Sequence, residues 1–301
     1  MKAQHPPVCD YEGSGYQENF WDRGGREYED QVEAIALHRL LPPSGSLLLE
    51  LGAGAGRNTP RYPGFPRIVL LDYSLSQLRL AQERLGISER YVYVAADVYR
   101  LPFTAGLFDA ATMIRTLHHL QEPALALEQL RQVLQPGAIF ILEYANKRNL
   151  KAILRYWLGR QSWNPFSLAP VEFAELNFDF HPRAVRLWLA AAGFRLERQL
   201  TVSHFRIAWM KRLLPLGLLV KLDALFQWSG AWWQLTPSVF LRSTALGEPR
   251  EAPSGDFFRC PECKFHLLAE SGDRLDCPSC QRSWAIRDGI YDFRQPADNS
   301  G

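Results

Sequence analysis

Leu47-Leu-Leu-Glu50-Leu-Gly52-Ala-Gly54-Ala-Gly56-Arg57 is the stretch from which the architecture follows. The apolar run 47–51 is typical of a parallel strand that is covered on both faces. Three glycines follow, and a backbone without Cβ atoms can turn sharply and let a ligand lie against the main chain. In open α/β sheets, ligands bind at the carboxyl ends of such strands. The stretch therefore predicts an α/β fold with a ligand site after its first strand.

The glycine spacing bears on which ligand binds. A dinucleotide turn reads G-x-G-x-x-G, but here Arg57 occupies the position of the third glycine. Glu50 would repel a pyrophosphate and attract a cationic amino group. The stretch resembles motif I of the class I S-adenosylmethionine (SAM)-dependent methyltransferases. This resemblance implies that Glu50 orients the loop or the amino group and that the turn residues admit the methionyl end of SAM, namely Gly52, Ala53, Gly54 and Gly56. A glycine turn with only a structural role is the alternative.

Two further expected strands also end in acids. Strand 67–72 ends in Asp72, 22 positions after Glu50, and strand 91–97 ends in Asp97. An acid after the second strand can accept hydrogen bonds from ribose hydroxyls in either NAD or SAM enzymes. Three acids in this order, with Leu101-Pro-Phe103 after the third, resemble the methyltransferase pattern. The resemblance implies that Asp72 and its neighbour Tyr73 bind the ribose, that Asp97 binds the adenine amino group, and that Val98 lies against the ring.

The next motifs bear on the acceptor. Strand 108–114 is followed by Arg115-Thr-Leu-His118-His119-Leu120, and strand 138–144 follows a Pro136-Gly137 turn, both resembling the same family. We include Arg115 among the cofactor-binding residues. No Asn-Pro-Pro-Tyr tetrapeptide is present, which argues against exocyclic base amines and glutamine amides as acceptors. A general base is needed only if the acceptor loses a proton. The candidates for this base are His118, His119, Tyr144 and His181. The alternative for each is a residue that packs behind the site.

Two segments exceed a minimal domain. The segment 147–180 begins with a basic amphipathic helix, and 206–236 is apolar with four tryptophans. Charged residues interrupt the second segment, so it does not predict a transmembrane helix. The basic helix predicts either a solvated helix over the cleft or a surface, through 147–160, that meets anionic lipid or phosphate. The segment 206–236 suits a lid over an apolar substrate or a membrane-surface contact, and its alternative is ordinary packing on the core or on a partner subunit.

Cys260-Pro-Glu-Cys263 and Cys277-Pro-Ser-Cys280 supply four thiolates at a spacing suited to a tetrahedral zinc ion. Without a secretory signal, metal ligation is favoured over disulfides. The run 283–290 resembles the end of a small zinc-ribbon family that includes activator subunits of methyltransferases acting on tRNA, rRNA and release factors. That resemblance implies a structural zinc.

Composition and charge bear on the partners and the compartment to be expected. The chain has 301 residues, 47% of them hydrophobic, and a net charge of +2. This near balance gives no reason to expect a nucleic-acid partner, although it does not exclude one. The N-terminus has no apolar core, so we expect no signal peptide and a cytoplasmic protein, either free or peripheral to the membrane. The sequence is silent on oligomeric state.

Together these observations predict a Rossmann-like seven-stranded methyltransferase sheet, mostly parallel with an antiparallel last strand, with helical insertions and a small C-terminal zinc ribbon. The expected function is methyl transfer from SAM to a small, apolar acceptor such as a quinone, a lipid-linked species or a secondary metabolite. The alternatives are an RNA or translation-protein acceptor recruited by the ribbon, and a non-catalytic SAM-binding scaffold. The expected divisions are an N-terminal aromatic segment (1–45), the SAM-binding domain (46–246, with insertions at 147–180 and 206–236), a linker (247–256) and the ribbon (257–301).

Overall fold

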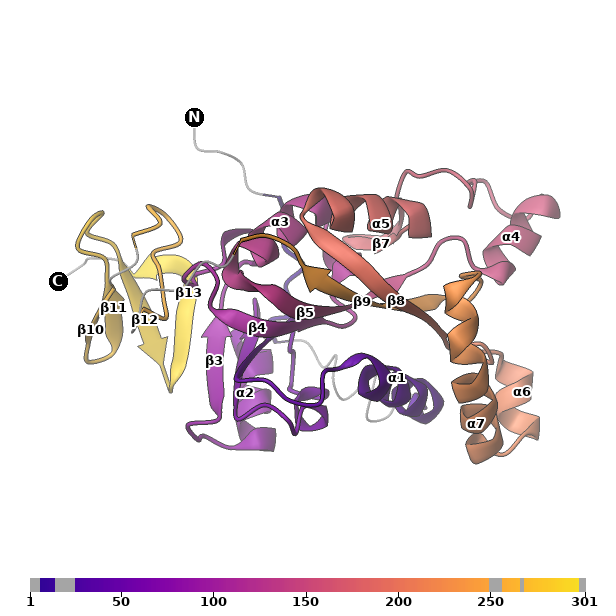
Figure 1. Ribbon diagram of the computed structural model, residues 1–301, viewed down its shortest axis with the longest axis horizontal. Helices are drawn as coiled ribbons and strands as arrows, with labels where there is room; N and C mark the ends of the chain where they lie inside the picture. Colours follow the sequence, from indigo (N-terminus) through magenta and orange to yellow (C-terminus); the bar gives the residue numbers. More distant parts are fainter. Residues whose placement is uncertain (1–5, 14–24, 249–255, 266–267, 298–301) are drawn as a thin grey trace.

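The computed structural model describes residues 6–13, 25–248, 256–265 and 268–297. An 11-stranded sheet in the order β10-β11-β12-β13-β3-β2-β1-β4-β5-β9-β8 runs through the molecule (Figure 1). The linker 247–256 lies largely outside the described residues. The central strands are β1 (Leu47–Leu51), β2 (Arg67–Asp72), β3 (Tyr91–Ala95), β4 (Phe108–Met113), β5 (Leu134–Ala145), β8 (Phe194–Val202) and β9 (Ser238–Ala245).

The seven central strands confirm the predicted methyltransferase sheet. Strand β1 pairs in parallel with β2 and β4, and β9 lies antiparallel between β5 and β8. Leu48, Leu49 and Leu51 are almost completely buried, as expected for a strand covered on both faces. Because β1 lies between β2 and β4, its carboxyl end opens at the centre of the sheet, where the chain reverses its direction of winding.

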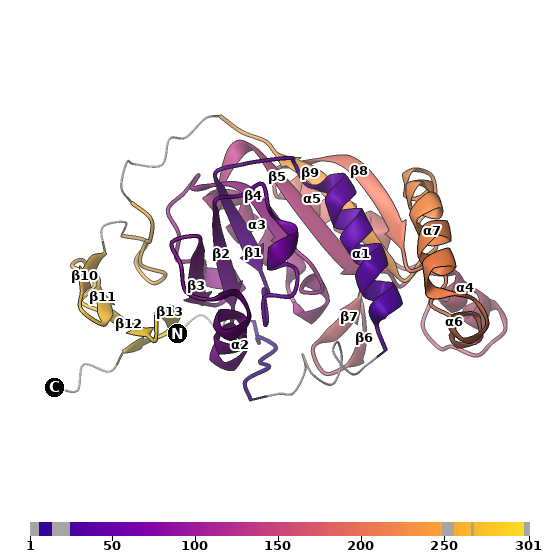
Figure 2. The ribbon, with the colours of Figure 1, turned by 90° about the horizontal axis from the view of Figure 1, so that it is seen from below.

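Helices cover both faces of the sheet. In Figures 1 and 2, α1 and α2 lie on one face, and α3 and α5 lie on the other. Ser74 caps α2 by accepting a hydrogen bond from the Gln77 amide, as predicted. The apolar stripe Val32, Ala36 and Leu40 of α1 packs into one of the buried clusters. The bounds are α1 (Glu27–Leu40), α2 (Leu75–Leu85), α3 (Pro123–Val133) and α5 (Pro182–Ala191), with short helices η2 (Thr59–Arg61), η3 (Val98–Arg100) and η4 (Leu117–His119).

The helices of the two insertions lie at the end of the molecule beyond β8 (Figure 1). The predicted basic helix is α4 (Leu150–Trp157), which starts later than expected because the Asn149 side chain caps it. A two-stranded sheet, β6 (Val171–Ala174) with β7 (Asn177–Asp179), was not predicted. The second insertion forms α6 (Ala208–Leu213), α7 (Leu216–Phe226) and η5 (Gln227–Ala231).

The C-terminal strands extend the main sheet. These strands are β10 (Ala269–Ser271), β11 (Arg274–Asp276), β12 (Ser283–Arg287) and β13 (Ile290–Ala297). Strand β13 pairs in parallel with β3, and Phe258 stacks on the buried Phe103. The Arg294 guanidinium lies 3.4 Å from the Tyr73 carbonyl oxygen, which it can reach as a donor. The cysteine-containing segment is thus joined to the sheet edge by backbone pairing and by aromatic contact.

Candidate functional site

The glycine turn forms one wall of a small pocket, here called the glycine pocket, at the carboxyl ends of β1 and β2. Gly52 has φ +66°, and a Cβ there would lie 2.0 Å from the Thr116 hydroxyl oxygen, so only glycine fits. A Cβ on Gly54, which has φ +51°, would occupy otherwise open space. Gly56 likewise has no room for a Cβ, which would meet Leu85 of α2 at 2.8 Å. Gly54 thus leaves room for a ligand, while Gly52 and Gly56 allow Thr116 and helix α2 to pack closely against the turn.

Glu50 acts on the loop and does not line the pocket. Its buried carboxylate accepts hydrogen bonds from Thr59 Oγ1 (2.6 Å) and from the Tyr62 hydroxyl (3.2 Å). Burial raises the pKa of Glu50 to about 7, although both donors oppose the shift. Of the two predicted roles, orienting the loop is the one that this geometry favours. Ala53 is buried behind the turn.

Asp72 lies where a ribose-binding acid is expected. It lines the glycine pocket and accepts hydrogen bonds from the amides of Gly54 (2.8 Å) and Ser74 (3.0 Å). Burial raises its pKa, and these amides oppose the shift. Each carboxylate oxygen retains lone-pair capacity for a ligand hydroxyl. Tyr73 lines the same pocket.

The third acid is placed differently from the second. Val98 lines the glycine pocket, but Asp97 does not. The Asp97 carboxylate caps η3 by accepting from the Tyr99 amide at 2.8 Å and lies 3.6 Å from the Arg100 guanidinium. In this arrangement Asp97 fixes the backbone that presents Val98 to the pocket.

A buried ion-pair network joins the glycine turn to α1. Arg115 has φ 56°, its amide donates to Glu143 (3.0 Å) and its guanidinium donates to Glu33 (2.9 Å). Arg57, in the position of the missing third glycine, also donates to Glu33 (3.1 Å) and to Asp30. Burial alone would raise the pKa of Glu33, but the two arginines hold it below its ordinary value. Arg57 therefore attaches α1 to the turn, a role that a glycine could not fill.

The glycine pocket is lined in part by Val8, Cys9 and Tyr11 of the N-terminal segment. The Tyr11 hydroxyl lies 3.0 Å from His119 Nε2, and Val8 pairs with Leu120. Other aromatics of this segment, Tyr16, Phe20 and Trp21, lie outside the described residues. This segment places a phenol next to the histidine pair.

A second space, here called the inner groove, continues from the glycine pocket and has a volume of about 740 Å³. The two spaces share Tyr11, Arg115 and His119. Glu143 lies at the back of the inner groove, where burial raises its pKa and the Ser238 hydroxyl donates to it (2.7 Å). A molecule in the inner groove would therefore lie directly beside the glycine pocket.

The two neighbouring histidines differ in their partners. His119 is already engaged at both ring nitrogens, because its Nδ1 lies 3.2 Å from the Leu176 carbonyl. His118 Nδ1 is buried without a hydrogen-bond partner among the described residues. Burial lowers the pKa of both rings, and for His118 the nearby His119 and Arg115 add to the shift. His118 thus stays a candidate as a neutral hydrogen-bonding group toward the inner groove, which it lines.

The geometry does not support Tyr144 and His181 as catalytic groups. Tyr144 is 1% exposed, packs in the hydrophobic core and lines none of the spaces described here. His181 caps α5, its Nδ1 accepting from the Arg183 amide at 3.1 Å. Burial and neighbouring basic groups such as Arg148 lower the pKa of His181 to about 4. In both cases the geometry favours the alternative to a catalytic role, a polar ring that packs in the core or caps a helix behind the site.

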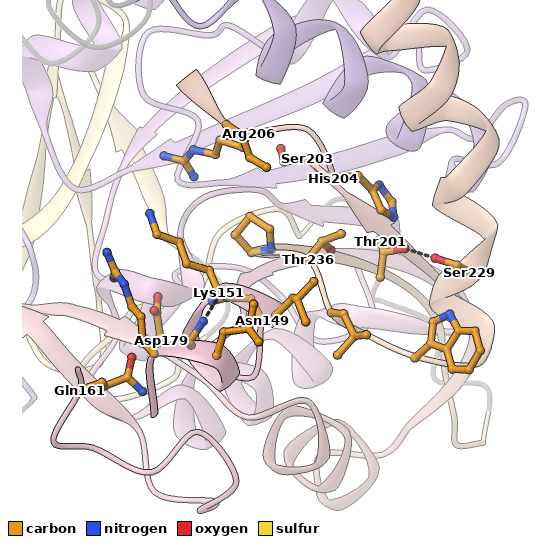
Figure 3. A pocket seen from close by; sticks show the side chains of 18 of the residues that line it. Asn149, Lys151, Gln161, Asp179, Thr201, Ser203, His204, Arg206, Ser229 and Thr236 are labelled. Atoms are coloured by element: carbon orange, nitrogen blue, oxygen red, sulfur yellow. Dashed lines mark hydrogen bonds between the residues drawn. The ribbon is translucent and has the colours of Figure 1, made fainter. Parts of the chain in front are cut away.

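A carboxylate that the sequence did not single out lies at the far end of the inner groove. Asp179, the last residue of β7, lines both the inner groove and a larger space of about 1430 Å³, here called the outer groove. No donor among the described residues hydrogen-bonds its carboxylate. Burial raises the pKa of Asp179 to about 6, although Arg206 and Lys147 oppose the shift. Figure 3 shows Arg206 and Asp179 on opposite sides of the outer groove.

The four cysteines predicted to bind metal come together. Their sulfur atoms all lie within 4.8 Å of one another, with Cys260–Cys280 at 3.6 Å and Cys263–Cys277 at 3.5 Å. Zinc–sulfur bonds of about 2.3 Å in a tetrahedron would separate sulfurs by about 3.8 Å. The four sulfur positions therefore fit the tetrahedral coordination of one metal ion by thiolates, and the cluster could bind a metal.

The sheet order and the glycine pocket at its centre define the fold class of SAM-dependent methyltransferases. A family profile described as a methyltransferase domain matches residues 49–142. Demethylmenaquinone methyltransferase of Clavibacter sepedonicus is 34% identical over 200 residues, which cover 62% of this chain and 82% of that protein. The chain therefore belongs to the class I SAM-dependent methyltransferase family.

Two further matches have lower sequence identity to this chain. The 2-phytyl-1,4-naphtoquinone methyltransferase of Nostoc punctiforme is 29% identical, with 55% of this chain and 76% of that protein covered. Among solved structures, a SAM-dependent methyltransferase from Mesorhizobium loti superposes with a TM-score of 0.52 at 20% identity, covering 72% of this chain and 99% of that one. At such low identity, the structural match supports the fold alone.

Proposed function

We propose that the protein transfers the methyl group of SAM to a small acceptor of the quinone or lipid-linked class that carries an apolar tail. The observation that carries this proposal is the continuity of three spaces. The glycine pocket shares Arg115 and His119 with the inner groove, which in turn shares Asp179 and Arg206 with the outer groove. An acceptor ring in the inner groove would lie next to the glycine pocket, with its tail along the outer groove. The quinone substrates named for two relatives support this class.

The residues of the glycine pocket suit SAM. Asp72 would accept hydrogen bonds from the ribose hydroxyls, and the bare backbone at Gly54 would admit the methionyl end. Val98 would lie against the adenine, while Asp97 holds the backbone beside it. When bound, SAM supplies a methyl group on a sulfonium centre, which makes the group electrophilic.

Asp179 is the group proposed to accept the proton that the acceptor releases. Methylation at a hydroxyl oxygen or a ring carbon releases one proton from the acceptor, and a carboxylate within reach can accept it. With its pKa near 6, Asp179 is mostly ionised at neutral pH and yet basic enough to take up a proton. Arg206 faces the groove and would stabilise the negative charge that develops on the acceptor oxygen as its proton leaves, before the methyl group is transferred. Positioning by the groove walls would provide much of the remaining acceleration.

The cysteine cluster is proposed to bind one structural zinc ion. Four thiolates complete a tetrahedron and leave no open coordination position for catalysis. Trp284 and Phe293 of this segment pack into the main hydrophobic core, so the segment has no separate core and metal binding would contribute to holding its two cysteine turns together.

The test uses purified protein, SAM labelled in its methyl group, and two acceptor sources: a lysate of the source organism and a demethylated naphthoquinol with an isoprenoid tail. The products are separated into organic extract, RNA and protein, and an Asp72→Ala variant serves as the inactive control. Label in the organic extract is expected. Label confined to RNA or protein would overturn the proposal.

The second candidate function is methylation of RNA or of a translation protein recruited by the zinc ribbon. The observation in its favour is that β13 joins the ribbon to the catalytic sheet. Against it stands the near balance of charge, 34 Lys and Arg against 32 Asp and Glu, because polyanion binding calls for a basic surface. The same product separation distinguishes the two candidates.

A further inference from the structure

We propose that the end of the molecule formed by the helices of the two insertions docks on an anionic lipid bilayer, with the outer groove opening toward the lipid. This inference rests on the proposed function only for the delivery of an acceptor. The binding itself is argued from the surface of α4, α6, α7 and η5 (Figure 1).

The mouth of the outer groove is apolar and exposed. Six exposed apolar side chains from both insertions line it: Leu154, Leu158, Ile207, Phe226, Trp233 and Leu235. Nearby on the same elements, Trp157 is 70% exposed, Trp209 59% and Trp232 77%. Large apolar surface that stays in contact with water at one end of a protein marks an interaction site. Figure 3 looks into this groove, where Thr201 and Ser229 form one wall.

Positive charge predominates on the two insertions. Residues 147–180 carry five Lys and Arg, one of them the buried Lys147, and three acids, whereas 206–236 carry four Lys and Arg and one acid. That acid, Asp223, is fully buried and accepts a hydrogen bond from the Tyr28 hydroxyl at 2.6 Å. Lys151, Arg155 and Lys221 are exposed. The whole chain is nearly neutral, so this is a local surplus of positive charge.

These features favour a bilayer over a protein partner. Tryptophan prefers the boundary between headgroups and acyl chains, and each basic residue near an anionic surface adds roughly 1 kcal/mol of attraction. Short amphipathic helices such as α4 can lie in the plane of that boundary. None of the helices in the described part of the chain combines the length and apolar character needed to cross a bilayer. Contact with one lipid leaflet is therefore the arrangement that fits the surface.

Docking on a bilayer would also let the outer groove admit an acceptor directly from the lipid. The outer groove continues into the inner groove through shared walls that include Asn149, Asp179 and Arg206. A lipid-borne acceptor could therefore pass its head toward the glycine pocket while its tail remains in an apolar environment. This avoids the cost of moving an isoprenoid tail through water, about 0.8 kcal/mol for each CH₂ group.

The experiment is co-sedimentation of the full-length protein with vesicles, either neutral phosphatidylcholine or a 3:1 mixture of phosphatidylcholine and phosphatidylglycerol, at physiological salt. Wild type is expected to bind the anionic vesicles at least tenfold more tightly than the neutral ones. The double variant Trp157→Ala/Trp232→Ala should lose at least about 10-fold in affinity, and Lys151→Gln/Arg155→Gln about 30-fold.

Matched controls lie at the other end of the molecule. Ile87, which is 78% exposed, is replaced as Ile87→Ala, and the exposed Arg84 and Arg195 are replaced together by Gln. Both controls should bind as wild type does. The proposal is overturned if wild type stays in the supernatant, if the controls lose as much affinity, or if light scattering reveals a dimer that the tryptophan variant dissociates.

The two proposals fail separately. If the protein methylates a detergent-dispersed quinol but does not bind vesicles, only the docking proposal is contradicted. If it binds vesicles but labels only RNA or protein, the proposed acceptor class is contradicted and the lipid-binding surface is not.

Discussion

The glycine pocket is lined by backbone and short side chains at the carboxyl ends of β1 and β2, whereas the outer groove is lined by long side chains from two insertions. In and behind the pocket, hydrogen bonds fix the acids: Asp72, which lines it, accepts from the Gly54 amide, and Glu50, which lies behind the loop, accepts from Thr59. In the groove, Asp179 has no such partner among the described residues. The difference separates a rigid site for a constant ligand from an adaptable surface that can select an acceptor.

The largest expected effect lies on the groove side. Asp179→Asn removes the proposed base, so turnover should fall by about 10²- to 10⁴-fold while the Kd for SAM stays unchanged. In the wild type the carboxylate must be ionised, so turnover should be highest above pH 7 and fall as the pH drops through about 6. Steady-state rates across pH 5–8 with calorimetric SAM binding check both points. Glu175→Gln, an exposed acid of the preceding turn, is the control; turnover of Asp179→Asn within threefold of wild type would contradict the role.

The next effect tests the pocket. Asp72→Ala removes the ribose acceptor and leaves the Gly54 amide without its partner, so the affinity for SAM should fall at least about 100-fold. Isothermal titration calorimetry measures it directly, with the exposed Glu83→Ala on α2 as the control. Micromolar binding retained by Asp72→Ala would contradict the assignment of the cofactor site.

Metal removal tests whether the zinc ribbon stabilises the strands that carry the glycine pocket. Chelation or Cys277→Ser should unfold the ribbon, leaving β3 without its neighbour β13 and Tyr73 without Arg294. A loss of about 2 kcal/mol corresponds to a melting temperature roughly 4–8 °C lower for a domain of this size. Calorimetry with and without added zinc checks this. An unchanged melting of the main domain would mean that the ribbon folds independently and does not support the pocket.

The smallest expected effect is that of replacing His181, and it distinguishes the role of His181 from that of Asp179. His181 lies two positions after Asp179 but caps α5 instead of facing the groove. His181→Ala should cost about 1 kcal/mol of unfolding free energy, as other cap losses do, and leave turnover unchanged. Urea denaturation and rate measurements together check this. A turnover loss comparable to that of Asp179→Asn would return His181 to the list of catalytic groups.

The sequence predicted the pocket better than the groove. Gly52, Gly54 and Asp72 lie where a strand-end argument places them, because the carboxyl ends of parallel strands share one edge of the sheet. Asp97 and Glu50 were also singled out, although neither lines the pocket: Asp97 accepts from the Tyr99 amide, and Glu50 accepts from the side chains of Thr59 and Tyr62. Local pattern identifies a strand end, but not the direction in which its last side chain points.

The groove residues gave a weaker signal. Asp179 ends a short strand, β7, inside an insertion with no periodic pattern, so nothing marked it in the sequence. Arg57 was noticed only as a departure from a dinucleotide turn, and its ion pairs with α1 depend on a helix that precedes it by some twenty residues. Both residues gain their roles through contacts between elements that are distant along the chain.

The sequence by itself determined the order of strands and helices, the glycine turn, the strand-end acids and the four-cysteine cluster, because each depends on local backbone preference or on close spacing. Only the tertiary structure decided which polar groups face a cavity. Desolvation and partner groups set the pKa of Asp179, the pairing of His119 and the burial of Tyr144, and these come from packing between segments that the sequence places far apart. The continuity from the glycine pocket to the apolar mouth is likewise a property of the assembled fold.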